Sequence, residues 1–156
     1  MDAIRWVQDL PFSTWMRESS WAVFTWLILH MWGLALLAGG GALIAGRSFG
    51  LAKGVEPRLF DRFIPVMWVG FLIAAVSGVL LLMSYPAKAL TNGVFYLKFA
   101  FLAGAAVMTH RLLKGYAARP DAGFKGQAVL ALLMWVGLIA CGNLLKYTHH
   151  VLLVYE

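Results

Sequence analysis

The chain has 156 residues, of which 62% are hydrophobic and 13% are charged, and its mean hydropathy is +0.77. Soluble domains are about 45–50% apolar and about 25% charged, so this composition excludes an ordinary soluble enzyme and indicates a membrane protein. The net charge of +6 comes from cations that flank apolar segments, a pattern that favours membrane topology over nucleic-acid binding. The one cysteine, Cys141, lies in an apolar run, which excludes a disulfide framework.

Four long apolar segments follow a mixed N-terminal stretch. Residues 1–20 combine tryptophans with charged side chains, which predicts an interfacial segment along the membrane surface. The apolar segments lie at about 21–46, 63–84, 94–115 and 127–154, and each supplies the roughly 20 residues that a membrane-spanning helix needs. We therefore predict an all-α integral membrane four-helix bundle that forms one domain over residues 21–156.

The distribution of cations predicts the orientation of the bundle. The connectors after the first and third spans, with the adjoining helix ends, hold eight Lys and Arg, and the opposite side holds five. By the positive-inside rule, these connectors face the cytoplasm and both termini face the periplasm of a bacterial inner (plasma) membrane.

Polar side chains inside the spans are few and carry no negative charge. No Asp or Glu falls within a predicted span, so the spans lack the carboxylates that a proton relay or acid–base hydrolysis would need. The polar residues at depth are His30, Lys98, His110, Asn143, Lys146, Tyr147, His149 and His150. Counted at about 1.5 Å per residue from each helix midpoint, the lysines and all histidines except His110 share one layer toward the outer side.

The fourth span carries several of these residues at helical spacing. Asn143, Lys146, Tyr147 and His150 follow the i, i+3, i+4, i+7 pattern of one face, which we expect to turn into the bundle.

Two histidines on separate helices of a dry bundle suggest the bis-histidine ligation of a haem b. We expect His30 and His150 to be the axial ligands, with His149 as the substitute for His150. Lys98, Lys146 or Arg17 would neutralise the haem propionates, and Asn143 and Tyr147 belong to the same candidate cofactor-binding set. We also expect Gly33 and Gly142 to leave space for a flat group beside the imidazoles.

Three alternatives remain open at this point. A hydrogen bond to Tyr147 or Asn143 would satisfy His30 without a cofactor, and His149 and His150 would then be a helix end that meets water. Histidine and methionine also suit copper, but the methionines of the spans are spread over several levels. A cofactor-free accessory subunit would dock a larger membrane complex, or a second copy of the chain, through surface glycines and aromatic residues.

Several short motifs resemble a bacterial family of four-helix inner-membrane proteins of unknown function. They are Glu18-Ser19-Ser20-Trp21, His30 followed by Gly33-Leu34-Ala35-Leu36-Leu37 and Gly40, then Pro65, Ser77-Gly78, Pro86, and Asn92 with Phe95 and Lys98. That family is broadly similar to copper-resistance and cytochrome-like membrane domains. The resemblance implies a four-helix fold and a role for His30 and Lys98. The chain departs from the family pattern at Arg47, where an acidic-arginine pair is expected, and at Gly142-Asn143, where Gly-Arg is usual.

Together, these patterns favour a small b-type cytochrome or a haem-carrying membrane anchor subunit. Such a protein would pass electrons between a membrane quinone and a periplasmic partner. It would be an electron-transfer or accessory subunit rather than a stand-alone enzyme, and the sequence singles out no catalytic residue.

Overall fold

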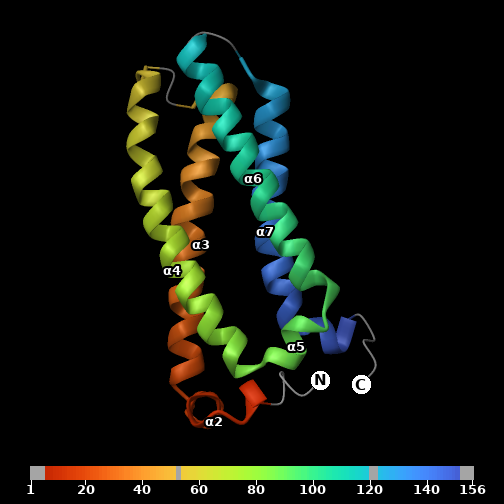
Figure 1. Cartoon of the computed structure of the whole chain (residues 1–156). Coiled ribbons are helices and arrows are strands. Elements are labelled where there is room, and N and C mark those ends of the chain that lie inside the picture. The colour runs from red at the N-terminus through yellow and green to blue at the C-terminus, as the bar shows by residue number, and fades with distance from the viewer. Residues whose placement is uncertain (1–5, 52–53, 120–122, 152–156) are drawn as a thin grey trace.

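The computed structural model describes residues 6–51, 54–119 and 123–151, and within these residues it is helical with no strand. Four long helices form the bundle: α3 (Ala22–Gly46), α4 (Phe63–Ser84), α6 (Gly93–Ala118) and α7 (Lys125–Val151). All four are long and apolar enough to cross a membrane. The α3–α4 pair lies beside the α6–α7 pair (Figure 1). The predicted all-α, four-helix membrane fold is therefore confirmed.

The helix ends agree with the predicted spans to within about three residues where both are described. The largest difference is at the end of α6, which continues past Gly115 to Ala118. A Cβ atom on Gly115 would lie 2.8 Å from Cζ of Phe124. This glycine therefore makes room for an aromatic ring and does not end the helix. The predicted end of the fourth span at residue 154 lies outside the described residues.

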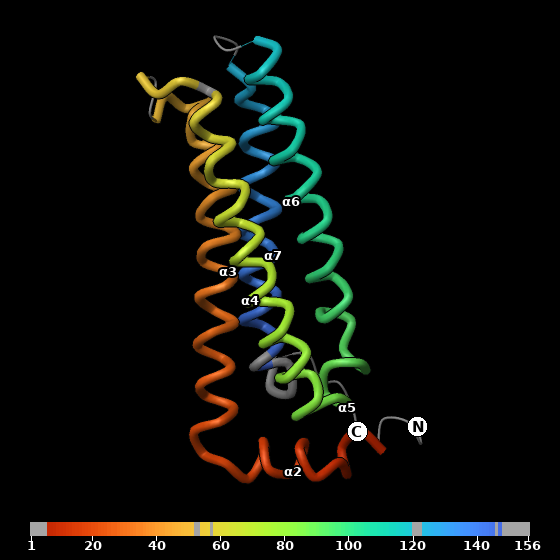
Figure 2. Tube along the Cα trace, turned by 60° about the vertical axis from the view of Figure 1, so that its left-hand side comes forward, coloured from red at the N-terminus to blue at the C-terminus, as the bar shows by residue number. Residues whose placement is uncertain are grey.

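Short helices occupy the connectors. A 3-10 helix, η1 (Arg47–Phe49), follows α3, a second one, η2 (Pro57–Arg62), precedes α4, and α5 (Pro86–Leu90) joins α4 to α6. Before the bundle, α2 (Pro11–Glu18) runs across the end of the long helices (Figure 2). The location of α2 on a membrane surface stays a prediction.

Polar contacts fasten α2 to the last turn of α4. The Ser13 hydroxyl donates to the carbonyl of Met83, and the Arg17 guanidinium donates to the carbonyl of Ser84 at 3.4 Å and to that of Gln8 at 2.7 Å. The last carbonyls of a helix have no partner within the helix, and a cation there also complements the helix dipole. Arg17 and Ser13 therefore cap α4 and hold α2 against the bundle.

Glycines bring the backbones of α3 and α4 into contact. A Cβ atom on Gly33 would lie 2.6 Å from the amide nitrogen of Ala74, and one on Gly70 would lie 2.8 Å from the carbonyl oxygen of Gly33. Helices in lipid associate through van der Waals packing, so small residues at the crossing point take the role that burial of large apolar side chains has in water. The α3–α4 crossing depends on these two positions.

Helix α7 packs on α3 through an aromatic ring. Trp135 is buried and fills the space above Gly41, where a Cβ atom would lie 2.1 Å from the indole nitrogen. That nitrogen donates a hydrogen bond to the Thr109 hydroxyl of α6 at 3.2 Å. One side chain thus connects α3, α6 and α7.

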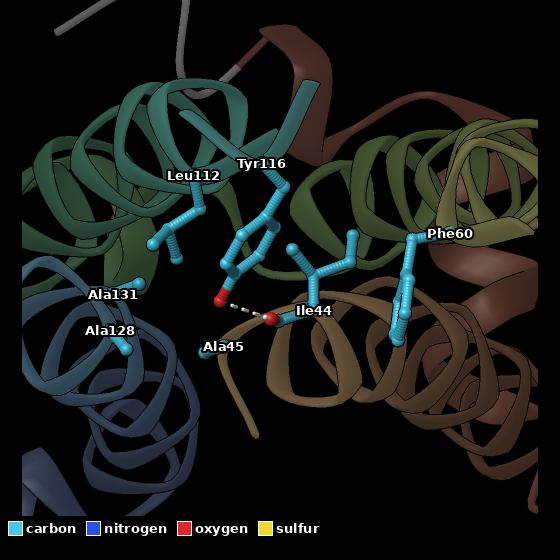
Figure 3. Packing of buried hydrophobic residues seen from close by; sticks show 7 residues of the cluster. All are labelled: Ile44, Ala45, Phe60, Leu112, Tyr116, Ala128 and Ala131. Atoms are coloured by element: carbon cyan, nitrogen blue, oxygen red, sulfur yellow. Dashed lines mark hydrogen bonds between the residues drawn. The ribbon is translucent and has the colours of Figure 1, made fainter. Parts of the chain in front are cut away.

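A compact cluster closes the bundle at the end that carries η1 and η2 (Figure 3). Its buried members are Ile44, Ala45, Phe60, Leu112, Tyr116, Ala128 and Ala131. The Tyr116 hydroxyl lies 2.6 Å from the Ser48 hydroxyl and donates to the carbonyl of Ile44 at 3.3 Å. The Arg47 guanidinium lies 5.5 Å from the centre of the Phe60 ring. Phe60 therefore anchors η2 to the ends of α3 and α6.

The α3–α4 crossing predicts a sharp difference between two glycines of α3. Gly33→Ala should destabilise the protein by about 1–3 kcal/mol, the usual cost of overpacking, because the new methyl group meets backbone that cannot move aside. Gly39 has no atom within 4 Å of its Cβ position. Gly39→Ala should therefore leave the thermal midpoint of the detergent-solubilised protein unchanged or raise it, since alanine favours helix. Equal destabilisation by both changes would contradict the crossing.

Candidate intramembrane site

His30 lies on α3 and directs one ring nitrogen at α4. Its Nδ1 is 2.8 Å from the carbonyl oxygen of Ala74 and 3.2 Å from the Ser77 hydroxyl oxygen. A carbonyl oxygen only accepts hydrogen bonds, so Nδ1 carries the proton and donates it. A neutral imidazole then has its lone pair on Nε2.

Lys98 of α6 meets that lone pair. Its Nζ lies 3.0 Å from Nε2 of His30, and because an ammonium group only donates, Lys98 is the donor. The resulting hydrogen-bonded chain, from Lys98 through His30 to Ala74 and Ser77, joins α6, α3 and α4. The sequence placed His30 and Lys98 in one layer, and their direct contact confirms that they share a level.

Two small residues of α4 make room for the imidazole. A Cβ atom on Gly78 would lie 3.1 Å from Cε1 of His30, so a larger residue there would push the ring away. The Ser77 hydroxyl donates to the carbonyl of Ile73 at 2.5 Å, which leaves its oxygen lone pair toward His30. Neither residue was among the predicted site residues, although the small pair Ser77-Gly78 inside the second span was a usable signal.

The polar face predicted for α7 does not turn into the bundle. Asn143 is exposed, and Tyr147 is 60% exposed. The buried face of α7 carries Ala128, Ala131, Trp135, Leu138 and Cys141 instead. The predicted orientation of this face is therefore wrong for Asn143 and Tyr147, and neither is among the described partners of His30. The reason is that the helix rotates to pack its small and aromatic side chains, which contribute more contact than two polar groups.

The remaining predicted site residues lie elsewhere or outside the description. Lys146, His149 and His150 belong to the last two turns of α7, and their side chains lie outside the described part of the structure. Arg17 lies at the α2–α4 contact. His110 is exposed on α6, twelve residues after Lys98, and so lies apart from the layer, as the sequence predicted.

A haem-ligating histidine needs one ring nitrogen held by a hydrogen bond, the other free for iron, and space for the flat ring. Metal-ligating histidines almost always donate their second ring nitrogen to a carbonyl or carboxylate, as Nδ1 of His30 does toward Ala74. Its Nε2, however, accepts from Lys98, so iron would have to displace that lysine. The space expected beside Gly33 is filled by the α4 backbone, whereas Gly142 has no atom within 4 Å of its Cβ position. Hence His30 is oriented as a ligand, and any flat group would lie away from Gly33.

The described residues contain no group of three or more His, Cys, Asp or Glu side chains that could hold a metal ion. A copper site with three or more ligands of these residue types is therefore not formed within residues 6–51, 54–119 and 123–151. The copper interpretation, which also involves methionine, stays a prediction.

Comparison with known proteins adds no assignment, because no family model, no curated protein and no solved structure matches the chain. The resemblance to the four-helix inner-membrane family stays a prediction.

The hydrogen bonds of His30 predict its protonation state. We expect a neutral Nδ1–H imidazole at neutral pH, visible in the nitrogen-15 chemical shifts of protein labelled at histidine, with the His30→Gln variant for assignment. Lys98→Met removes the donor to Nε2 and should shift the Nε2 resonance while leaving Nδ1 protonated. An Nε2–H tautomer in the unaltered protein would contradict the arrangement.

Proposed function

We propose that this protein is a small membrane electron-transfer subunit in which His30 is an axial ligand of a haem b. The observation that carries the proposal is the hydrogen bond of 2.8 Å from Nδ1 of His30 to the Ala74 carbonyl, which fixes the tautomer and aims the Nε2 lone pair away from α4. A bound haem would supply a one-electron redox centre. His150, or His149 in its place, is the proposed second ligand from α7.

Lys98 has a defined place in this proposal. It occupies the Nε2 side of His30 as a cation, at the position that a metal ligand bond requires. Since α3, α4, α6 and α7 contain no carboxylate, a displaced Lys98 has no acidic partner on any of these helices. The haem propionates are anions, so the positively charged Lys98, together with Lys146, is suited to pair with them.

The proposal includes an orientation and partners. With four helices crossing the membrane, both ends of the chain would lie on one side. The excess of cations on the α3–α4 and α6–α7 connectors favours the cytoplasm for those connectors. The layer of His30 and Lys98 then lies toward the periplasmic face of a bacterial inner membrane. Electrons would pass between a membrane quinone and a periplasmic partner.

A second candidate is a cofactor-free accessory subunit of a larger membrane complex. The observation that favours it is that both ring nitrogens of His30 have partners within the protein. In that case the Lys98–His30 pair serves to hold α6 against α3. A lysine at the centre of a spanning helix costs about 2.5–3.5 kcal/mol on insertion scales. Lys98 lies nearer the start of α6, and the imidazole would offset part of its smaller cost.

The two candidates predict different visible spectra for the protein and its variants. If His30 ligates haem, His30→Ala should abolish the haem content. Lys98→Met should retain haem, because it frees Nε2 while Lys146 remains to pair with the propionates. His110→Ala is the matched control, since it removes an imidazole from the same bundle outside the layer, and it should retain haem. The measurement is the visible spectrum of the purified, reduced protein, where a b-type haem gives a Soret band and sharp α and β bands.

Other spectra would decide against the proposal. A colourless protein in which Lys98→Met and His30→Ala both lower the thermal midpoint favours the accessory subunit. A colourless protein that retains stoichiometric copper favours a copper-handling protein. Equal haem retention in the His30→Ala and His110→Ala variants would remove His30 as the ligand.

A further inference from the structure

The exposed face of α6 is apolar in the middle of the helix and cationic near its C-terminal end. Ala103 and Val107 are exposed in its apolar middle, and Arg111 and Lys114 are exposed one and two turns later. Their spacing of four, four and three residues puts all four side chains on one side of the helix. The opposite side, with Ala105, Thr109, Leu112 and Tyr116, is buried in the bundle. A single face therefore runs from small apolar residues to two adjacent cations.

The two cations have no counter-ion among the residues that the structure describes. Arg111 and Lys114 make no hydrogen bond or ion pair with any residue of the described segments, and α6 contains neither Asp nor Glu. By contrast, Arg47 is engaged with Val55 and the Phe60 ring, and Arg119 lies 5.7 Å from the centre of the Phe124 ring. The α6 pair is thus available to an external anion, where the other two guanidinium groups are already used for packing.

The position of Arg111 and Lys114 along α6 indicates which kind of anion they would meet. Arg111 follows Lys98 by thirteen residues, which is about 20 Å along the axis. In a hydrocarbon layer about 30 Å thick, long cationic side chains at this position reach the headgroup level of the leaflet at the η2 end of the bundle. Basic residues between the ends of spanning helices attract the phosphates of anionic lipids.

We propose that Arg111 and Lys114 bind the phosphate of an anionic phospholipid from that leaflet. The guanidinium group offers two parallel donors to phosphate oxygens, and the ammonium group adds a point charge beside it. The acyl chains would lie along the face of Ala103 and Val107, where small side chains let them approach the helix.

The test uses the full chain in nanodiscs of phosphatidylcholine and phosphatidylglycerol, followed by native mass spectrometry of the lipids that stay bound. Arg111→Gln with Lys114→Gln should lower the retention of phosphatidylglycerol relative to phosphatidylcholine by roughly tenfold or more, the size expected for two cations at an anionic surface. Arg111→Lys with Lys114→Arg keeps both charges and should retain most of the lipid, which separates lost binding from lost folding.

The control removes the same charge at the same end of the bundle. Arg58 and Arg62 of η2 are also exposed, but they lie on another element. Arg58→Gln with Arg62→Gln should leave phosphatidylglycerol retention within about twofold of the unaltered protein. An equal loss in both double variants would overturn the site in favour of diffuse surface charge. Displacement of the lipid by inorganic phosphate at a similar concentration would overturn its identity as a lipid site.

Discussion

A series of hydrogen bonds without a carboxylate joins three of the four long helices. Lys98 donates to His30, and His30 donates to the backbone of α4 at Ala74. In hydrocarbon, each polar group without a partner is costly, so the proton positions in this series follow from which atoms can only donate and which can only accept. His30 both donates and accepts, and it links the other two helices. The tautomer of His30 therefore determines that its Nδ1 faces α4 and its Nε2 faces Lys98 of α6.

The close approach of α3 and α4 and the position of this imidazole are consequences of the same packing. Gly33 and Gly70 bring the two backbones into contact, and Gly78 leaves the space that the ring enters two turns further along α4. If the helices were separated by ordinary side chains, the Ala74 carbonyl would lie too far from Nδ1 for a direct hydrogen bond. The glycines of the first and second spans thus act on the candidate site through the distance between helices, even where they touch no part of it.

Much of the fold follows from the sequence because hydrocarbon thickness fixes the length of a span and apolar composition marks it. The shared layer of His30 and Lys98 followed from counting residues along each helix. The partner on α4 did not, because a backbone carbonyl such as that of Ala74 leaves no mark in the sequence. The rotation of α7 about its own axis could not be predicted from the sequence either. The spacing of Asn143 and Tyr147 identifies a face, but the packing of Trp135 on Gly41 decides which way the helix turns.

The competition for Nε2 of His30 decides what the site can do. With Lys98 as donor, the imidazole is a neutral bridge between helices and the positive charge stays on α6. If a metal centre takes that lone pair, the charge of Lys98 is released into a layer where none of the four long helices carries a carboxylate. It then becomes available to an anion carried by the ligand. Cofactor binding would then replace the contact of Lys98 with His30 by a contact of Lys98 with a propionate, and no new unpaired charge would be buried. This makes Lys98, more than His30, the residue whose removal distinguishes a structural bridge from a redox site.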